Sequence, residues 1–345
     1  MKKKWTIVLL VLLAIIIVLG ALGYKYYRYI YSPNTNLPAN KQSVYIYIPS
    51  DANYKHVQSK IAPYLNTTES FYWVAEKKQY PSFIKPGRYK IKKGMNNNEI
   101  INMLRVGEQA PVHVSFISLR TLNILAGKVA SYLEPDSADF ADFFHHDTVP
   151  ASYGFDDYTF PCMFLPNTYQ FLWNTSPNAF CERMKKEYHR FWNQSRIQKA
   201  DKTGLSPTEI STLASIVEQE SKKEDEKPRI AGVYINRLQK GMHLQADPTL
   251  IYATGNFFTQ RVLNKHKKID SPYNTYLYPG LPPGPICLPS ISSIDAVLNF
   301  EKHDYLFFCA KPDISGYHNF AKTYAQHRQY AREYRQFLNN NKIYN

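Results

Sequence analysis

Hydrophobic and polar positions divide the chain into an uncharged N-terminal run and a longer region of short periodic segments. Residues 5–23 carry no charged side chain, and as a helix they would span about 28 Å, close to the hydrocarbon thickness of a bilayer. We interpret this run as a single transmembrane helix. A cleavable signal peptide is the alternative, with 21–23 as its small-residue site, but the apolar region of a signal peptide is shorter, roughly 7 to 15 residues.

The residues that flank this run predict its orientation. Lysines at positions 2–4 favour a cytoplasmic tail over residues 1–4 and a single-pass protein of the inner (cytoplasmic) membrane whose C-terminal part is extracytoplasmic. Lys25 and Arg28 on the other side weaken this asymmetry. Residues 24–40 are polar and punctuated by proline, which predicts a short tether. We expect an aromatic belt at the outer interface from Tyr24, Tyr26, Tyr27, Tyr29 and Tyr31.

Residues 41–117 alternate between strand and helix patterns. Val44 to Ile48 has the period of a strand, residues 54–65 that of a helix, and Gly87 to Ile91 again that of a strand. Asn96 to Asn98 can cap a helix that reaches Leu104, and residues 112–116 read as a strand. The pattern predicts a small compact module.

Helical periods dominate after residue 120. Together with short strands at 304–310 and 316–320, they predict an α+β, helix-rich domain over residues 118–345. The proline-rich stretch 279–289 must be extended because proline lacks an amide donor. The expected helices cover residues 121–133, 137–144, 177–200, 207–222, 226–240, 292–300 and 321–338.

The helix expected at 207–222 carries two glutamates, Glu218 and Glu220. Its start is well marked, because Ser206 can cap it, a proline occupies the first position and a glutamate follows three residues after the cap. At about 100° per residue, Glu220 falls within the apolar stripe of this helix. Glu218 lies nearer the edge of the stripe and should be more easily solvated, so the two acids should differ in environment.

A carboxylic acid in an apolar pocket suits general acid catalysis. Burial disfavours the charged form, so the pKa rises and the proton is kept near neutral pH. The alternative for Glu220 is an ion pair with Arg229 or Arg237 that only fixes the helix.

Seven phrases of the chain, taken in order, carry a resemblance to a known family. They are Lys85–Tyr89, Phe164–Tyr169, Leu213–Glu220, Ala231–Leu238, Gly241–Thr249, Tyr273–Tyr276 and Gly280–Ile286. In this order they resemble the phrases of the endolytic murein transglycosylases of the YceG-like family. Two departures concern the edge of a groove: Asn167 stands where the family has aspartate, and 288–290 read Leu-Pro-Ser in place of Asn-Pro-Gly.

This resemblance implies a LysM-like module over residues 41–117, a YceG-like catalytic domain over 118–345 and Glu220 as the catalytic acid. The implied reaction cleaves bonds between N-acetylmuramic acid and N-acetylglucosamine within peptidoglycan strands, leaves 1,6-anhydro ends and ends the elongation of nascent strands. Implied partners are glycan strands, membrane lipid around the N-terminal helix and cell-wall synthesis enzymes. The candidate substrate-binding residues are Glu218, Gln245, Asp247, Tyr273, Asn274 and Tyr276.

Other interpretations stay open at this point. Because Pro248 follows it, Asp247 can equally cap a helix over residues 248–253. A two-carboxylate muramidase-type hydrolase would pair Glu220 with Glu218 or Asp247. A non-catalytic scaffold that binds glycan is the third alternative, and in it Glu220→Gln should preserve function.

The net charge and the cysteine spacing limit the binding partners and the metal or redox sites that we expect. The net charge of +14 faces the cell envelope in the predicted topology, so we expect anionic wall polymers and lipid phosphates rather than nucleic acid. The four cysteines lack CxxC spacing, and we expect neither a metal nor a cofactor. They are either disulfide-bonded or small buried hydrophobes. His318 and His327 are interpreted as structural or groove-lining residues.

Overall fold

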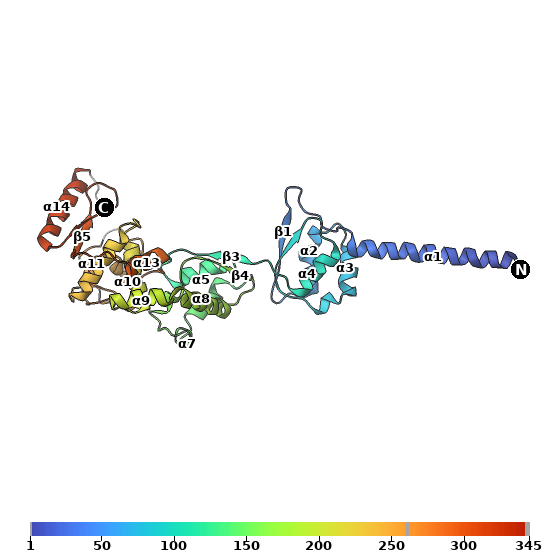
Figure 1. Ribbon diagram of the computed structural model, residues 1–345, viewed down its shortest axis with the longest axis horizontal. Helices are drawn as coiled ribbons and strands as arrows, with labels where there is room; N and C mark the ends of the chain where they lie inside the picture. Colours follow the sequence, from blue (N-terminus) through green and yellow to red (C-terminus); the bar gives the residue numbers. More distant parts are fainter. Residues whose placement is uncertain (1, 260–261, 342–345) are drawn as a thin grey trace. The chain divides into compact units, whose positions relative to one another are not determined.

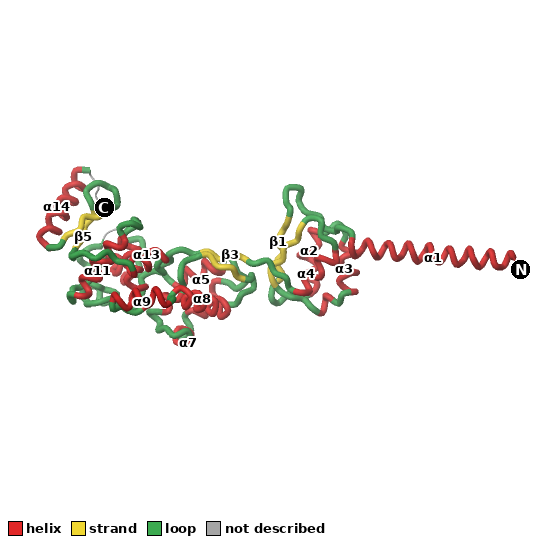
Figure 2. The backbone as a smooth tube through the Cα atoms, in the orientation of Figure 1, coloured by secondary structure: helices red, strands yellow, loops and turns green. Residues whose placement is uncertain are grey.

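The computed structural model describes residues 2–259 and 262–341, and the chain forms two compact units (Figure 1). The N-terminal unit comprises residues 1–113, 132–134 and 170–175, and the C-terminal unit comprises 114–131, 135–169 and 176–345. Helices predominate over short strands in the C-terminal unit (Figure 2). This mixture agrees with the α+β class expected from the sequence.

Most of the elements are short helices, and the short strands between them are paired two by two. Short 3₁₀ turns lie at Ala62–Tyr64, Tyr80–Ser82, Phe160–Met163 and His266–Lys268. In chain order, the helices and strands are α1 (Lys2–Tyr31), β1 (Ser43–Ile48), α2 (Tyr54–Ile61), α3 (Thr68–Lys77), β2 (Gly87–Lys92), α4 (Asn97–Val106), β3 (Val112–Ser115), α5 (Leu122–Ala130), α6 (Ser137–Phe144), α7 (Val149–Ser152), β4 (Thr168–Phe171), α8 (Pro177–Phe191), α9 (Gln194–Thr203), α10 (Pro207–Glu220), α11 (Lys227–Gln239), α12 (Asp247–Thr254), α13 (Ile291–Leu298), β5 (Phe307–Ala310), β6 (His318–Ala321) and α14 (Tyr324–Asn340).

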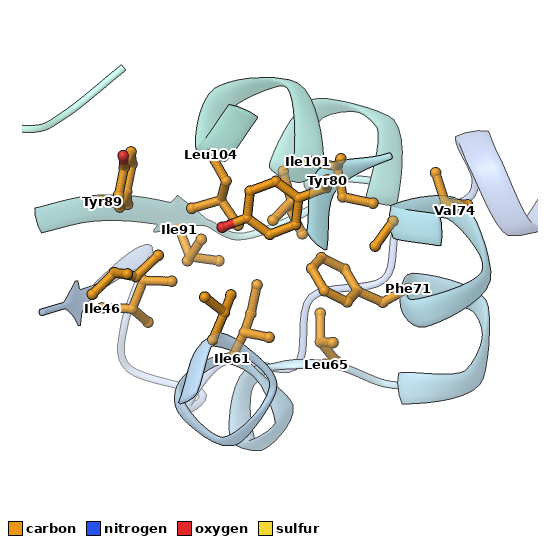
Figure 3. Packing of buried hydrophobic residues seen from close by; sticks show 14 of the residues in the cluster. Ile46, Ile61, Leu65, Phe71, Val74, Tyr80, Tyr89, Ile91, Ile101 and Leu104 are labelled. Atoms are coloured by element: carbon orange, nitrogen blue, oxygen red, sulfur yellow. The ribbon is translucent and has the colours of Figure 1, made fainter. Parts of the chain in front are cut away.

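The N-terminal unit is built on one antiparallel strand pair. Strands β1 and β2 pair from Ser43 opposite Lys92 to Ile48 opposite Gly87. Alternate side chains of β1 are buried, as its period of two predicted. Figure 3 shows how they meet side chains of α2, α3 and α4 in one apolar core, with Phe71 and Tyr80 fully buried.

The predicted tether over residues 24–40 differs from the structure. Helix α1 continues to Tyr31, and the next residues bind to the N-terminal unit instead of extending freely. The Asn34 side chain is 4% exposed; its amide donates to the Thr67 carbonyl at 2.8 Å and to Asn97 Oδ1 at 2.8 Å. Its own oxygen accepts from the Thr67 amide at 2.9 Å. A buried, fully bonded asparagine therefore fixes the chain directly after α1.

Replacing Asn34 by alanine should destabilise the N-terminal unit by about 2 kcal/mol, because the Thr67 amide and the Asn97 carbonyl oxygen would lose their partners inside the protein. Asn102→Ala is the matched control, since Asn102 is exposed and accepts from a lysine side chain at the surface. Chemical denaturation of both variants in detergent measures the difference. Equal stability of the two variants would contradict this role of Asn34.

Helix α1 is long and apolar enough to cross a membrane. Its span Lys3–Tyr31 has a mean hydropathy of 3.1 over its most apolar window, none of which is buried in the protein. Two tyrosines of the predicted aromatic belt contact the N-terminal unit: the Tyr26 ring stacks on Trp73 at 4.6 Å, and the Tyr29 hydroxyl donates to Glu69 at 2.8 Å. The last turns of α1 are therefore part of this unit.

Helix α10 forms the centre of the C-terminal unit. Ser206 caps it in a capping box with Glu209, and Pro207 occupies its first turn, as the sequence predicted. Every residue from Ile210 to Val217 is buried, because α9, α11, α12 and α13 all pack against this helix. The helix ends at Glu220, since Ser221 has extended backbone angles. Because α10 is held on several sides, the position of its last residue, Glu220, is fixed.

The structure differs from the predicted local structure in three places. The single helix expected at 177–200 is two helices: Trp192 leaves the helical conformation, and Asn193 accepts from the Arg196 amide and caps α9. The segment containing α3 was not predicted to be helical, although Phe71 and Val74 bury its inner face. Strand β4 was also missed.

All four cysteines are free. Cys162, Cys181 and Cys287 are buried and Cys309 is partly buried. Burial raises the pKa of the Cys287 thiol, which keeps it protonated. Of the two expectations, the second holds: these are small apolar core residues and not disulfides.

Candidate active site

A cavity of about 310 Å³ opens at the end of α10 in the C-terminal unit. Four of the residues predicted for the site line it together: Glu220, Gln245, Asp247 and Tyr276. They come from α10, from the loop before α12, from the start of α12 and from the turn near residue 276. The remaining lining residues are Tyr234, Arg237, Leu244, Phe307, Phe308, Tyr324 and His327.

Glu220 is the last residue of α10 and retains a proton near neutral pH. Burial raises the pKa of its carboxyl from 4.5 to about 7; the Tyr234 hydroxyl opposes this rise, and the negative Asp247 adds to it. A helix C-terminus also disfavours a negative charge because its carbonyls point outward. Glu220 therefore has the pKa of a general acid.

Tyr234 on α11 is the direct partner of Glu220. Its hydroxyl donates to Glu220 Oε1 at 2.5 Å, and its side chain is 2% exposed. Burial and the neighbouring carboxyl raise the pKa of Tyr234 well above its usual value, so this group remains a donor. Because Oε1 is occupied, the other oxygen, Oε2, is the one that can carry the transferable proton.

The ion pair considered for Glu220 is not formed among the described residues. Arg229 pairs with Glu301 at 2.9 Å instead. Arg237 donates to the main-chain carbonyls of Leu306, His243 and Leu244. Glu220 thus faces the cavity with neither of these arginines bound to it.

Replacing Tyr234 by phenylalanine should raise the pH above which Glu220 can no longer act as a general acid. The Tyr234 hydroxyl stabilises the carboxylate, so its loss raises the pKa of Glu220 further, by about one unit for one hydrogen bond to a charged group. A general acid acts while protonated, so the alkaline limb of kcat/KM should move upward from about pH 7. A pH profile of both proteins measures this shift. A limb that stays in place or moves to lower pH would contradict it.

Arg237 organises two walls of the cavity. Its side chain is 7% exposed, and its donation to Leu306 fixes the segment before β5 while its donation to His243 and Leu244 fixes the loop before α12. In that loop, Gln245 has a positive φ of 51°, a strained conformation for a residue with a side chain. The surrounding hydrogen bonds hold Gln245 in this conformation, and it lines the cavity.

Asp247 does not cap α12. It is the first residue of that helix, and no side-chain hydrogen bond from the described residues caps the start. Its carboxylate instead accepts from the Tyr276 hydroxyl at 2.5 Å. Burial and Asp247 together raise the pKa of Tyr276, which stays a donor. Asp247 and Tyr276 are therefore hydrogen-bonded to each other, and both line the same cavity as Glu220.

Glu218 lies in a different environment from Glu220, as expected, and it is partly exposed. Its side chain is 12% exposed. Ser290 Oγ donates to Oε2 at 2.5 Å, Ser293 Oγ donates to the same oxygen, and the buried Lys227 ammonium lies 3.3 Å away. Although burial opposes it, these hydroxyls and the lysine lower the pKa of Glu218. Glu218 is a fixed carboxylate and does not line the Glu220 cavity.

Two other predicted substrate-binding residues, Asn274 and Tyr273, lie outside the lining of the cavity. Asn274 is fully buried; its amide donates to the carbonyls of Lys267 and Ile269, and its oxygen accepts from the Tyr276 amide. Tyr273 is 9% exposed and packs on Tyr252 at 4.6 Å between ring centroids. Neither lines the cavity; Asn274 positions the backbone of Tyr276.

Residues 307–327 form part of the cavity wall, and most of these wall residues were not predicted from the sequence. Phe307, Phe308 and Tyr324 line the cavity, and His327 stacks on Phe307 at 5.4 Å. Burial and Arg237 lower the pKa of His327, so it is neutral at pH 7. His327 is thus groove-lining, as the sequence suggested. His318 is structural: its Nδ1 lies 2.7 Å from the buried Glu226.

The chain matches a known family and known proteins over most of its length. A profile of the YceG-like family matches residues 46–333. The chain is 29% identical over 317 residues to an endolytic murein transglycosylase of Bacillus subtilis strain 168, covering 86% of each chain. It is 28% identical over 338 residues to an endolytic murein transglycosylase of Streptococcus pneumoniae strain D39. That match covers 85% of this chain and 59% of the pneumococcal protein, which is considerably longer.

A solved structure has a similar fold. The crystal structure of a yceG-like protein from Listeria monocytogenes aligns with 84% of this chain and 99% of its own, with a TM-score of 0.57 and 27% sequence identity. Similarity in sequence and in fold therefore extends over both units.

Proposed function

This chain belongs to the YceG-like family, and from that premise we propose that it is a peptidoglycan lytic transglycosylase that cleaves within glycan strands. The observation that carries the proposal is the Glu220 carboxyl at the end of a buried helix, with a pKa raised to about 7 and a cavity in front of it. The relatives named endolytic murein transglycosylases support the same reaction class.

In the first step, Glu220 donates its proton to the oxygen that joins N-acetylmuramic acid to N-acetylglucosamine. The bond from that oxygen to the anomeric carbon breaks, and the leaving sugar departs with the new hydroxyl. Positive charge then develops on the muramic acid ring. The Asp247 carboxylate, hydrogen-bonded to Tyr276, is a negative group of the cavity that can stabilise this charge.

In the second step, the C6 hydroxyl of the same muramic acid attacks its anomeric carbon. Glu220, now a carboxylate, accepts the hydroxyl proton and returns to its starting state. Tyr234 stabilises the carboxylate in the interval by its hydrogen bond to Oε1. No water is consumed, and the product is a 1,6-anhydro end.

A two-carboxylate hydrolase remains the second candidate, on one observation: Asp247 shares the cavity with Glu220. Glu218 is not suited as the second carboxylate because it lines another cavity and is held by Ser290, Ser293 and Lys227. A hydrolase would leave reducing ends.

The cellular setting is also part of the proposal. Helix α1 would anchor the protein in the cytoplasmic membrane with both units outside, where cleavage of new strands would end their elongation. The N-terminal unit, in which two helices lie between β1 and β2, would be a LysM-like module that contacts glycan. Synthesis enzymes of the wall would be neighbours there.

Product analysis tests the reaction class. The full chain, purified in detergent, is incubated with uncrosslinked glycan strands, and the new ends are identified by mass spectrometry. Anhydro ends, which lack one water relative to reducing ends, are expected from the wild-type protein. Reducing ends would establish the hydrolase, and an absence of cleavage would favour the glycan-binding scaffold.

A further inference from the structure

A second cavity, of about 690 Å³, lies beside the last turn of α10 in the C-terminal unit. None of its lining residues lines the Glu220 cavity. Helix α10 contributes to both, because Glu218 and Gln219 line this one while Glu220, one residue later, lines the other. A ligand here would therefore lie close to a strand bound at Glu220.

Positive groups in this cavity are available to a ligand. Arg120 lines it, and its Nη1 atom is buried without a hydrogen-bond partner among the described residues. Lys222 lines it as well and is exposed. A buried guanidinium nitrogen without an acceptor is costly, and carboxylates are its preferred partners because they accept two parallel hydrogen bonds.

Two carboxylates, Glu218 and Glu224, also line this cavity, and Glu218 has a free oxygen. The hydrogen bonds from Ser290, Ser293 and Lys227 all reach Oε2 of Glu218, and among the described residues none reaches Oε1. Oε1 can therefore accept from an ammonium or amide group of a ligand. A neutral sugar ring brings only hydroxyl and acetamido groups, whereas a peptide brings both carboxylates and N–H donors.

We infer that this cavity binds the peptide stem carried by the muramic acid next to the cleavage site, with a stem carboxylate at Arg120 and Lys222 and an N–H donor at Glu218. The inference rests on the proposed function, because it places the stem beside a strand held at Glu220. It makes the enzyme selective for strands that still carry their peptides.

The test compares two uncrosslinked glycan preparations, one with intact stems and one treated with an amidase so that only lactyl carboxylates remain. The wild-type full chain should cleave the peptide-bearing strands about tenfold faster in kcat/KM, the effect of one charge-assisted hydrogen bond. Arg120→Gln should lose about tenfold on peptide-bearing strands and less than threefold on peptide-free strands. Lys222→Gln, an exposed position that does not threaten folding, should show a smaller change of the same kind.

Arg190→Gln is the matched control, since it removes one arginine charge from an exposed site on α8 and should alter neither rate. Equal wild-type rates on both preparations, or equal losses on both in a folded Arg120→Gln variant, would overturn the inference and leave the proposed function intact. Should the wild-type protein cleave neither preparation, the proposed function fails. Calorimetric titration with the isolated stem peptide then decides the inference: binding weakened by Arg120→Gln supports it, and no binding overturns it.

Discussion

Glu220→Gln is expected to lower the rate of strand cleavage at least a thousandfold. Glutamine keeps the size and shape of the side chain but has no acidic proton to transfer and is too weak a base to accept one from the C6 hydroxyl, and general acid–base catalysis contributes about 10²–10⁴-fold per step. Both steps of the proposed reaction use this residue. The measurement is the appearance of new strand ends, followed by mass spectrometry, with the full chain and the variant.

The inactive variant should be at least as stable as the wild-type protein, so unfolding would not explain its loss of activity. The pKa of Glu220 is raised from 4.5 to about 7, so between these values the folded protein holds a proton that the unfolded chain releases, and wild-type stability falls as pH rises through this window. Glutamine does not ionise, so the variant does not lose stability in this pH window. Glu220→Gln should therefore unfold at an equal or higher temperature than the wild-type protein at pH 8. Glu218→Gln is the comparison variant; loss of cleavage there alone would overturn the assignment of the acid.

Arg237→Met should destabilise the C-terminal unit by about 3 kcal/mol. Arg237 is 7% exposed, and its guanidinium donates to three main-chain carbonyls, two at 2.7 Å and one at 3.2 Å. Methionine fills similar space but leaves these carbonyls without donors. The strained backbone at Gln245 would also lose its support, so cleavage should fall even where the protein is folded.

Arg229→Met is the matched control on the same helix. Its side chain is 42% exposed and pairs with an equally exposed Glu301, so its loss should cost less than about 1 kcal/mol. Chemical denaturation of the full chain in detergent gives both values. Equal losses for the two variants would show that the main-chain hydrogen bonds of Arg237 do not hold the site together.

Local signals in the sequence predicted the central part of this site. The cap at Ser206 and the apolar period after it place α10 correctly, and the same period places Glu220 toward the core. The phrases that resemble the family brought in Gln245, Asp247 and Tyr276, which line one cavity with Glu220. The strands β1 and β2 were predicted because a period of two is readable within a single segment.

What the sequence missed depends on contacts between distant segments. The two serine donors of Glu218 were not predicted, because one helix does not reveal its neighbours; α13, which lies about 70 residues later, supplies Ser293 and its cap Ser290. The tether was expected to be free because the partners of Asn34 lie beyond residue 66. Likewise, the hydrogen bond of Tyr234 to Glu220 requires the angle between α10 and α11.

The ionisation of Glu220 decides whether this side chain can act as the acid. Its carboxyl carbon can be followed by NMR during a pH titration of the full chain in detergent, with Glu220→Gln used to assign the signal. We expect a titration midpoint near pH 7, well above the ordinary 4.5. A midpoint at or below 4.5, with or without bound glycan, would refute the proposed mechanism, because the side chain would then hold no proton to donate at neutral pH.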